Sequence, residues 1–470
     1  MLKNIIKKEI QETITSPKFV ITFIICTILI LLSVFTGISA YRAEQKEYSA
    51  AIVLNKKNLE SATDYQVLAN QGIKINRPPQ VLSSIVSGVS EAIGRVATVN
   101  YINDPSLFDS KYESNPVFSI FGALDLTFIV RIVLSLFAIL FTYDVIVGEK
   151  ERGTLKLILS NQIPRDRLLM GKVVGGYISL LISLIIPLIL GLLILLIYPN
   201  ISMSGQDWVR LFIMVLIYFL YLSVFFTLGL LVSARTNKSA TSFLVLLFIW
   251  VIFVTVIPKI SILAAAQLDP IPSVHEITAK KDGFLLQTQE EAILRNRQWG
   301  KEHSPKTVEE QNRYPEELKK FLDEIRKWAS SRVEEYYGAL DRDYQLRKRS
   351  QEKLAINLSR ISPASALMFS TMSLARTGLD EHDRFLASLH SYKSVFSKWV
   401  NALLLKNFRF DRVKGDYPPV ELTNMPQHKF EPESLGSSLV RTLPDIGLML
   451  VLIIFFFAGA YASFLKYDVR

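Results

Sequence analysis

A phosphate-binding loop is the first chemical possibility that this sequence raises. Gly148 and Gly153 have the glycine spacing of the Gly-x-x-x-x-Gly-Lys-Ser/Thr loop, in which backbone amides and the lysine hold the phosphates of a nucleotide. Thr154 stands where that lysine is required, and the stretch follows an apolar run rather than a soluble strand. We therefore predict that this chain does not bind ATP by that route.

The histidines and the cysteine do not form a recognisable metal or protease centre. All histidines lie in one long polar region, and no set of carboxylates or cysteines completes a site around them. They are His275, His303, His382, His390 and His428. The sequence contains no His-Glu-x-x-His motif, and its single cysteine, Cys26, excludes an intrachain disulfide and a cysteine-based metal cluster. We predict no catalytic residues and no metal site.

The remaining chemical signal is a charged stretch, residues 143–172, between two apolar runs. Four charged residues, Glu149 to Arg152, are followed at once by Gly153 and Thr154. Leu155, Ile158 and Leu159 then fall at i, i+3 and i+4, which is one apolar face of a short helix. Such a helix can lie on the membrane surface or bind a partner protein. The simpler alternative is a solvated, positively charged connector.

The elements that position this stretch are membrane spans. Half of the 470 residues are hydrophobic and the mean hydropathy is positive, which together with the long apolar runs indicates a membrane protein. The net charge is +10, but the basic residues flank apolar runs instead of gathering on one soluble face, so nucleic acid is not expected as a partner. We expect an interfacial helix over 1–18, spans over 19–40, 126–147, 173–197, 209–232, 240–266 and 443–465, and a connecting loop over 148–172.

Two long polar insertions interrupt these spans. Residues 41–125 are expected to form a small external domain or loop, and residues 267–442 an external helical domain. The short connections on the same side of the membrane as 148–172 carry lysine and arginine, whereas the loop 198–208 on the other side has none. By the positive-inside rule both termini are then cytoplasmic, and both insertions are external.

The charged stretch resembles the hallmark of permeases of the ABC-2 type exporter family, in which Glu-x-Glu-x-Gly-Thr-Leu follows the second span. The matching residues here are Glu149, Glu151, Gly153, Thr154 and Leu155, followed by Leu159, Ser160, Pro164, Arg165, Gly171 and Lys172. The insertion before the last span is similar to a narrower branch of such permeases with a large extracytoplasmic domain. The resemblance implies an all-α membrane protein with six transmembrane helices, an interfacial N-terminal helix and a helical extracytoplasmic domain.

The resemblance also implies partners and site residues. Two permease subunits, identical or homologous, would pair in the cell (inner) membrane and bind two copies of an ABC ATPase, which carries the ATP and Mg. Gly153 and Thr154 would precede the docking face in the sequence. Leu155, Ile158 and Leu159 would enter an apolar cleft on that ATPase. Glu149, Glu151 and Arg152 would pair with its charges or cap the helix, and Asp144 would hold the end of the second span.

A different class of function also fits the same sequence features. The chain could be a membrane-anchored scaffold or sensor whose external domain binds a protein, without transport. The residues leave the substrate class open.

Overall fold

The computed structural model describes residues 2–61, 65–90, 92–101, 105, 107–108, 124–160, 164–198, 201–406, 422 and 424–466. The chain divides into two units. Unit 1 comprises Met1–Val256 and Ile361–Arg470, and unit 2 comprises Ile257–Arg360. Unit 2 is thus inserted into the sequence of unit 1.

Among the described residues, six helices are long and apolar enough to cross a membrane, which confirms the predicted all-α membrane fold. They are α2 (Pro17–Glu60), the run Leu126–Glu151, α10 (Arg165–Ile197), α11 (Gly205–Arg235), the run Ser239–Leu268 and α18 (Leu435–Leu465). The second run comprises α6 (Leu126–Phe128), the π-helix η2 (Ile129–Leu134), α7 (Ser135–Thr142) and α8 (Val147–Glu151). The fifth comprises α12 (Ser239–Val251), the π-helix η3 (Ile252–Val256) and α13 (Ile257–Leu268).

The first span is part of a longer helix than the sequence suggested. Ser16 caps α2 by accepting a hydrogen bond from the Phe19 amide, and Pro17 occupies the first turn, where its missing N–H costs nothing. The helix then continues past the expected end at Ala40 to Glu60. The residues after Ala40 are more polar, but they include many helix formers and no proline. The helix therefore has no reason to end at Ala40.

A small mixed core combines parts of both expected insertions. Strands β1 (Ile73–Asn76), β2 (Val96–Val99) and β3 (Leu107–Phe108) form an antiparallel sheet in the order β1-β2-β3. Apolar residues of the sheet share a core with α3 (Tyr65–Gln71) and with Phe385, Leu389 and Phe396 of α17 (Leu379–Lys406). This sheet was not predicted, because strands of four residues or fewer give little periodic signal.

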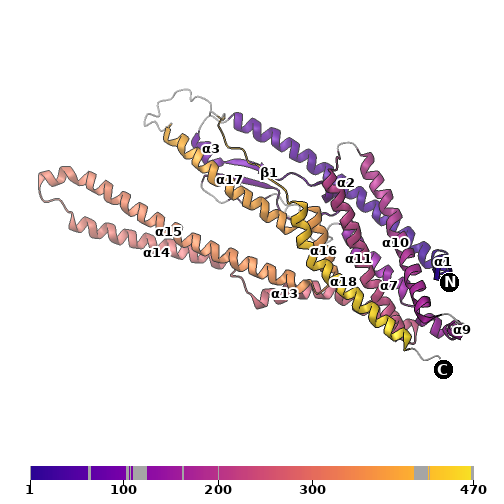
Figure 1. The fold of residues 1–470 in the computed structure, drawn as a ribbon. Helices are drawn as coiled ribbons and strands as arrows, with labels where there is room; N and C mark the ends of the chain where they lie inside the picture. The colour runs from indigo at the N-terminus through magenta and orange to yellow at the C-terminus, as the bar shows by residue number, and fades with distance from the viewer. Residues whose placement is uncertain are drawn as a thin grey trace. The chain divides into compact units, whose positions relative to one another are not determined.

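The residues of the expected domain over 267–442 are divided between the two units. Helix α16 (Pro363–Ala375) belongs to unit 1, where it packs against α18 and α11 and most of its residues are buried. In Figure 1, α16, α18 and α11 lie side by side within unit 1. The small and apolar composition of α16 (PASALMFSTMSLA) explains why it joins the apolar core.

Unit 2 is a helical hairpin. Helix α14 (Val274–Glu302) and helix α15 (Val308–Ser359) run antiparallel beside one another (Figure 1), and α13 also packs against α15. The Phe284 and Tyr336 rings stack with centroids 3.9 Å apart, and Arg332 pairs with Glu291 at 2.7 Å. The predicted helical character of this insertion is confirmed for these elements.

Candidate functional site

The backbone of the charged stretch consists of two short helices and a glycine between them. After α7 the chain turns through residues 143–146, forms α8, and starts α9 (Thr154–Ser160) after Arg152 and Gly153. Gly153 has φ +71°, a left-handed conformation that residues with a side chain adopt at a cost. The glycine of the motif is therefore required by the break between α8 and α9.

Asp144 connects this stretch to the beginning of the first span. Its carboxylate lies 2.6 Å from the Lys18 ammonium group, which also lies 4.5 Å from the centre of the Tyr143 ring. Lys18 is in the first turn of α2, 126 residues away in sequence. This pair therefore joins the end of span 2 to the start of span 1.

Helix α8 is hydrogen-bonded to the connection between α11 and α12. The amides of Ile146 and Val147 both donate to the Ser233 hydroxyl at 3.1 Å. The Glu151 carboxylate accepts from the Ser239 amide at 3.2 Å and from its hydroxyl, so it caps the first turn of α12. Lys150 donates to the Ala234 carbonyl at the end of α11.

Glu149 belongs to a buried ionic cluster with Glu9 and Lys172. The Lys172 ammonium lies 2.8 Å from Glu149 and 3.3 Å from Glu9, and the side chains are only 9%, 16% and 16% exposed, respectively. Glu9 lies in α1 (Leu2–Ile14) and Lys172 in α10. Burial raises the pKa of Glu9 above its usual value, although Lys172 opposes this change. One lysine thus holds two carboxylates from two different elements.

Helix α1 approaches α10 closely because two glycines line the contact. A Cβ atom on Gly171 would lie 2.4 Å from the Ile5 side chain, and one on Gly175 would lie 2.7 Å from the Glu9 Cβ. Small residues four apart on a helix allow another helix to pack against the backbone. The ionic cluster defined by Glu9, Glu149 and Lys172 therefore forms where α1, α8 and α10 meet.

The predicted apolar face of α9 is divided between the interior and the surface. Leu155 is 1% exposed and packs against Leu168, Leu169 and Phe464 within its own chain, so it is not available to a partner in this conformation. Leu157, which the sequence pattern did not single out, is 68% exposed. The side chains of Ile158 and Leu159 lie outside the described residues.

The other predicted residues have local roles. The Arg152 side chain donates to the Gly148 carbonyl at 3.1 Å, and the Thr154 hydroxyl donates to the Glu149 carbonyl at 3.3 Å. In the part of the chain that the structure describes, no three His, Cys, Asp or Glu residues are grouped to hold a metal ion. The contacts described above hold helices of this region together.

A second polar network lies at the other end of α11, and sequence reasoning missed it. Arg210 is fully buried and donates to the carbonyls of Leu374 and Glu433 and to the Ser438 hydroxyl, at 2.7–3.0 Å. It thereby joins α11 to α16 and α18. An arginine within an apolar run is expensive unless it is paired, and that signal could have identified it.

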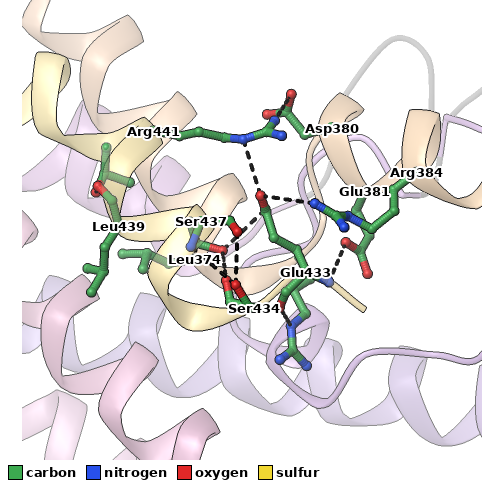
Figure 2. A network of polar contacts seen from close by, with 12 residues as sticks. Leu374, Asp380, Glu381, Arg384, Glu433, Ser434, Ser437, Leu439 and Arg441 are labelled. Carbon is green, nitrogen blue, oxygen red and sulfur yellow. Dashed lines mark hydrogen bonds and ion pairs between the residues drawn. The ribbon is translucent and has the colours of Figure 1, made fainter. Parts of the chain in front are cut away.

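Glu433 extends the network to α17. Figure 2 shows its carboxylate between Arg384 and Arg441, at 3.6 and 3.1 Å, and its amide donating to Glu381 at 3.1 Å. Arg441 also pairs with Asp380. The start of α18 is therefore held to α17 by several charged groups.

Comparisons with known proteins agree with this architecture. A family model described as ABC-2 family transporter protein matches residues 3–469. A probable ABC transporter permease protein NosY of Stutzerimonas stutzeri is 31% identical over 124 residues, which are 26% of this chain and 45% of that protein. The probable NosY of Pseudomonas aeruginosa is 46% identical over 50 residues, or 11% and 18% of the two chains. The similarity thus spans less than half of either relative.

Proposed function

Because the chain belongs to the ABC-2 family of transporter proteins, we propose that it is the membrane-spanning permease subunit of an exporter driven by a separate ABC ATPase. It is a multi-pass membrane protein, with six candidate spans in the part of the chain that the structure describes. The two NosY relatives bear the name of probable ABC transporter permeases, which supports the permease assignment.

The observation that carries the proposal is the set of contacts around α8. This helix and the turn before it bind α1 and α10 through Lys172, α2 through Asp144, and the α11–α12 connection through Ser233 and Ser239. A force applied to α8 and α9 is therefore passed to five other helices by ion pairs and hydrogen bonds. We propose that ATP-driven closure of two ATPase subunits supplies this force, with ATP and Mg bound by those subunits.

The proposed docking surface is the outer side of α9. Leu157 is exposed there, and Ile158 and Leu159 follow it in sequence. Asp144, Glu149 and Glu151 have partners in their own chain, so we assign them to transmission of the movement rather than to docking. In this arrangement both termini are cytoplasmic, the chain pairs with a second permease subunit in the cell membrane, and transport is directed outward.

A single charged substitution on α9 tests the proposed docking surface. Leu157→Glu should reduce co-purification of ATPase activity with the tagged full-length chain by about tenfold or more, because burying a leucine contributes about 1.5–3 kcal/mol. The measurement is ATP hydrolysis per permease after purification from native membranes. Leu346→Glu is the matched control, since Leu346 in α15 is also 68% exposed.

Two results would contradict the proposal. If Leu157→Glu retains the ATPase as the wild type does, the outer side of α9 is not the docking surface. If no ATPase accompanies the wild-type chain, the alternative of a membrane-anchored scaffold or sensor is favoured.

A further inference from the structure

Helix α14 has two opposite faces, of which one packs against α15 and the other is exposed. One faces α15 and carries Phe284, Thr288, Glu291 and Arg295, of which Thr288 is buried. Since a helix turns 100° per residue, the opposite side is formed by residues spaced alternately four and three apart. These residues are Ala279, Gly283, Leu286, Glu290, Ile293, Arg297 and Gly300, with Leu294 beside them.

This outer stripe of α14 is unusual for a surface in contact with solvent. Leu286, Ile293 and Leu294 are each more than half exposed. The outer face of a solvated helix is normally polar, and a helix that is apolar on two opposite sides is normally covered on both. The stripe therefore has the composition of a helix interface.

Gly283 and Gly300 indicate that another helix packs against this stripe. A Cβ atom on Gly283 or Gly300 would meet nothing within 4 Å, so no contact within the chain requires glycine there. Neither glycine has a positive φ. Glycine inside a helix lowers stability relative to alanine, but small residues on the surface let a second helix approach closely.

The charges on the stripe indicate which helix this is. Among the described residues, neither Glu290 nor Arg297 has an ion-pair partner in its own chain, although both are exposed. They lie at equal distances on either side of the point between Ile293 and Leu294. In an antiparallel pair of α14 helices with a two-fold axis at that point, Glu290 of each copy lies opposite Arg297 of the other. A parallel pair would place Glu290 against Glu290.

We propose that the outer stripe of α14 is a self-complementary docking surface for the α14 helix of a second copy of this chain. The contact is antiparallel and isologous, with Ile293 and Leu294 at its centre and the two Glu290–Arg297 pairs on either side. It is separate from the docking surface on α9, so either can fail without the other.

Cysteine cross-linking of the full-length chain in native membranes tests this contact. Cys26 is the only native cysteine and is fully buried. The cysteine introduced by Ile293→Cys is therefore the only one that is accessible for cross-linking. We expect a disulfide-linked dimer on mild oxidation. Leu346→Cys lies on α15 at a position that is 68% exposed, against 51% for Ile293, and should give none.

Charge exchange separates self-association from other occupants. In the Ile293→Cys background, Glu290→Arg should lower the cross-linked fraction about fivefold or more. The new arginine of each copy would then face Arg297 of the other copy, and like charges repel. Adding Arg297→Glu should restore the cross-linked fraction, since the pairs are re-formed in the opposite sense. The proposal is overturned if Ile293→Cys does not cross-link, or if the double exchange does not restore the dimer. Either result would show that the α14 helix of a second copy does not cover the stripe.

Discussion

Lys172 neutralises two carboxylates that come from distant parts of the chain, and its removal should be costly. Lys172→Met would leave Glu9 and Glu149 close together in a buried site without a cation. Breaking a buried ionic cluster in this way typically costs about 3–5 kcal/mol. We expect a loss of this order in the free energy of unfolding, measured by denaturant titration in detergent.

The control for this prediction is an exposed lysine. Lys348 pairs with Glu352 at 3.9 Å on the surface of α15, and Lys348→Met should cost less than about 1 kcal/mol. Replacing both Glu9 and Glu149 by glutamine in the Lys172→Met background should recover part of the loss. Equal stability of the Lys172→Met and Lys348→Met variants would show that the ionic cluster does not hold the helices together.

At this scale the sequence revealed residue types but not their partners. Glu149 and Glu151 were recognisable within the motif, yet Lys172 and Ser239 lie 23 and 88 residues further along the chain from Glu149 and Glu151. Pairings of this kind depend on how spans pack, and no local pattern encodes them. Leu155 illustrates the same limit, because periodicity placed it on an apolar face without indicating that its own chain covers that face.

At the scale of elements, the contact between α1 and α10 depends on the absence of two side chains. Gly175→Val would place a Cβ atom 2.7 Å from the Glu9 Cβ and 3.1 Å from the Ile6 carbonyl, so α1 must move. Overpacking usually costs about 1–3 kcal/mol. We expect a lower melting temperature and faster thiol labelling of a cysteine placed at Ile5.

Gly447→Val provides the comparison for this variant. Gly447 lies in α18, where an added Cβ would meet nothing within 4 Å. The same substitution should therefore change neither the melting temperature nor the labelling at Ile5. If Gly175→Val behaved like Gly447→Val, α1 would be a loosely held surface helix.

The elements that were predicted well are those with long and uniform patterns. Apolar runs of about 20 residues located the six spans, and 3.6-residue periodicity located the hairpin helix after Pro315. The features that were not predicted are short strands and the placement of a helix that depends on tertiary contacts. The four-residue strands β1 and β2 form because α17 covers them, and α16 joins unit 1 because α11 and α18 supply its apolar surroundings.

At the scale of the whole molecule, the proposed topology can be tested with cysteines at three exposed positions. Val53 and Leu346 should label with a membrane-impermeant thiol reagent in intact cells, because we place both insertions outside. Leu157→Cys should label only after lysis, because we place α9 in the cytoplasm. Labelling of Leu157→Cys in intact cells would contradict the proposed orientation. Protection of either other site would contradict the six-span topology.

The insertion of unit 2 into unit 1 also sets an order of events during synthesis. Arg210 is made long before Leu374, Glu433 and Ser438, the groups that satisfy it, and all of unit 2 is translated in between. At the usual 5–20 residues per second, unit 2 alone delays these partners by roughly 5–20 s. Throughout that interval the guanidinium group of α11 lacks the three partners that bind it in the folded chain. Until the C-terminal segment arrives, that group depends on water or on other groups for its hydrogen bonds.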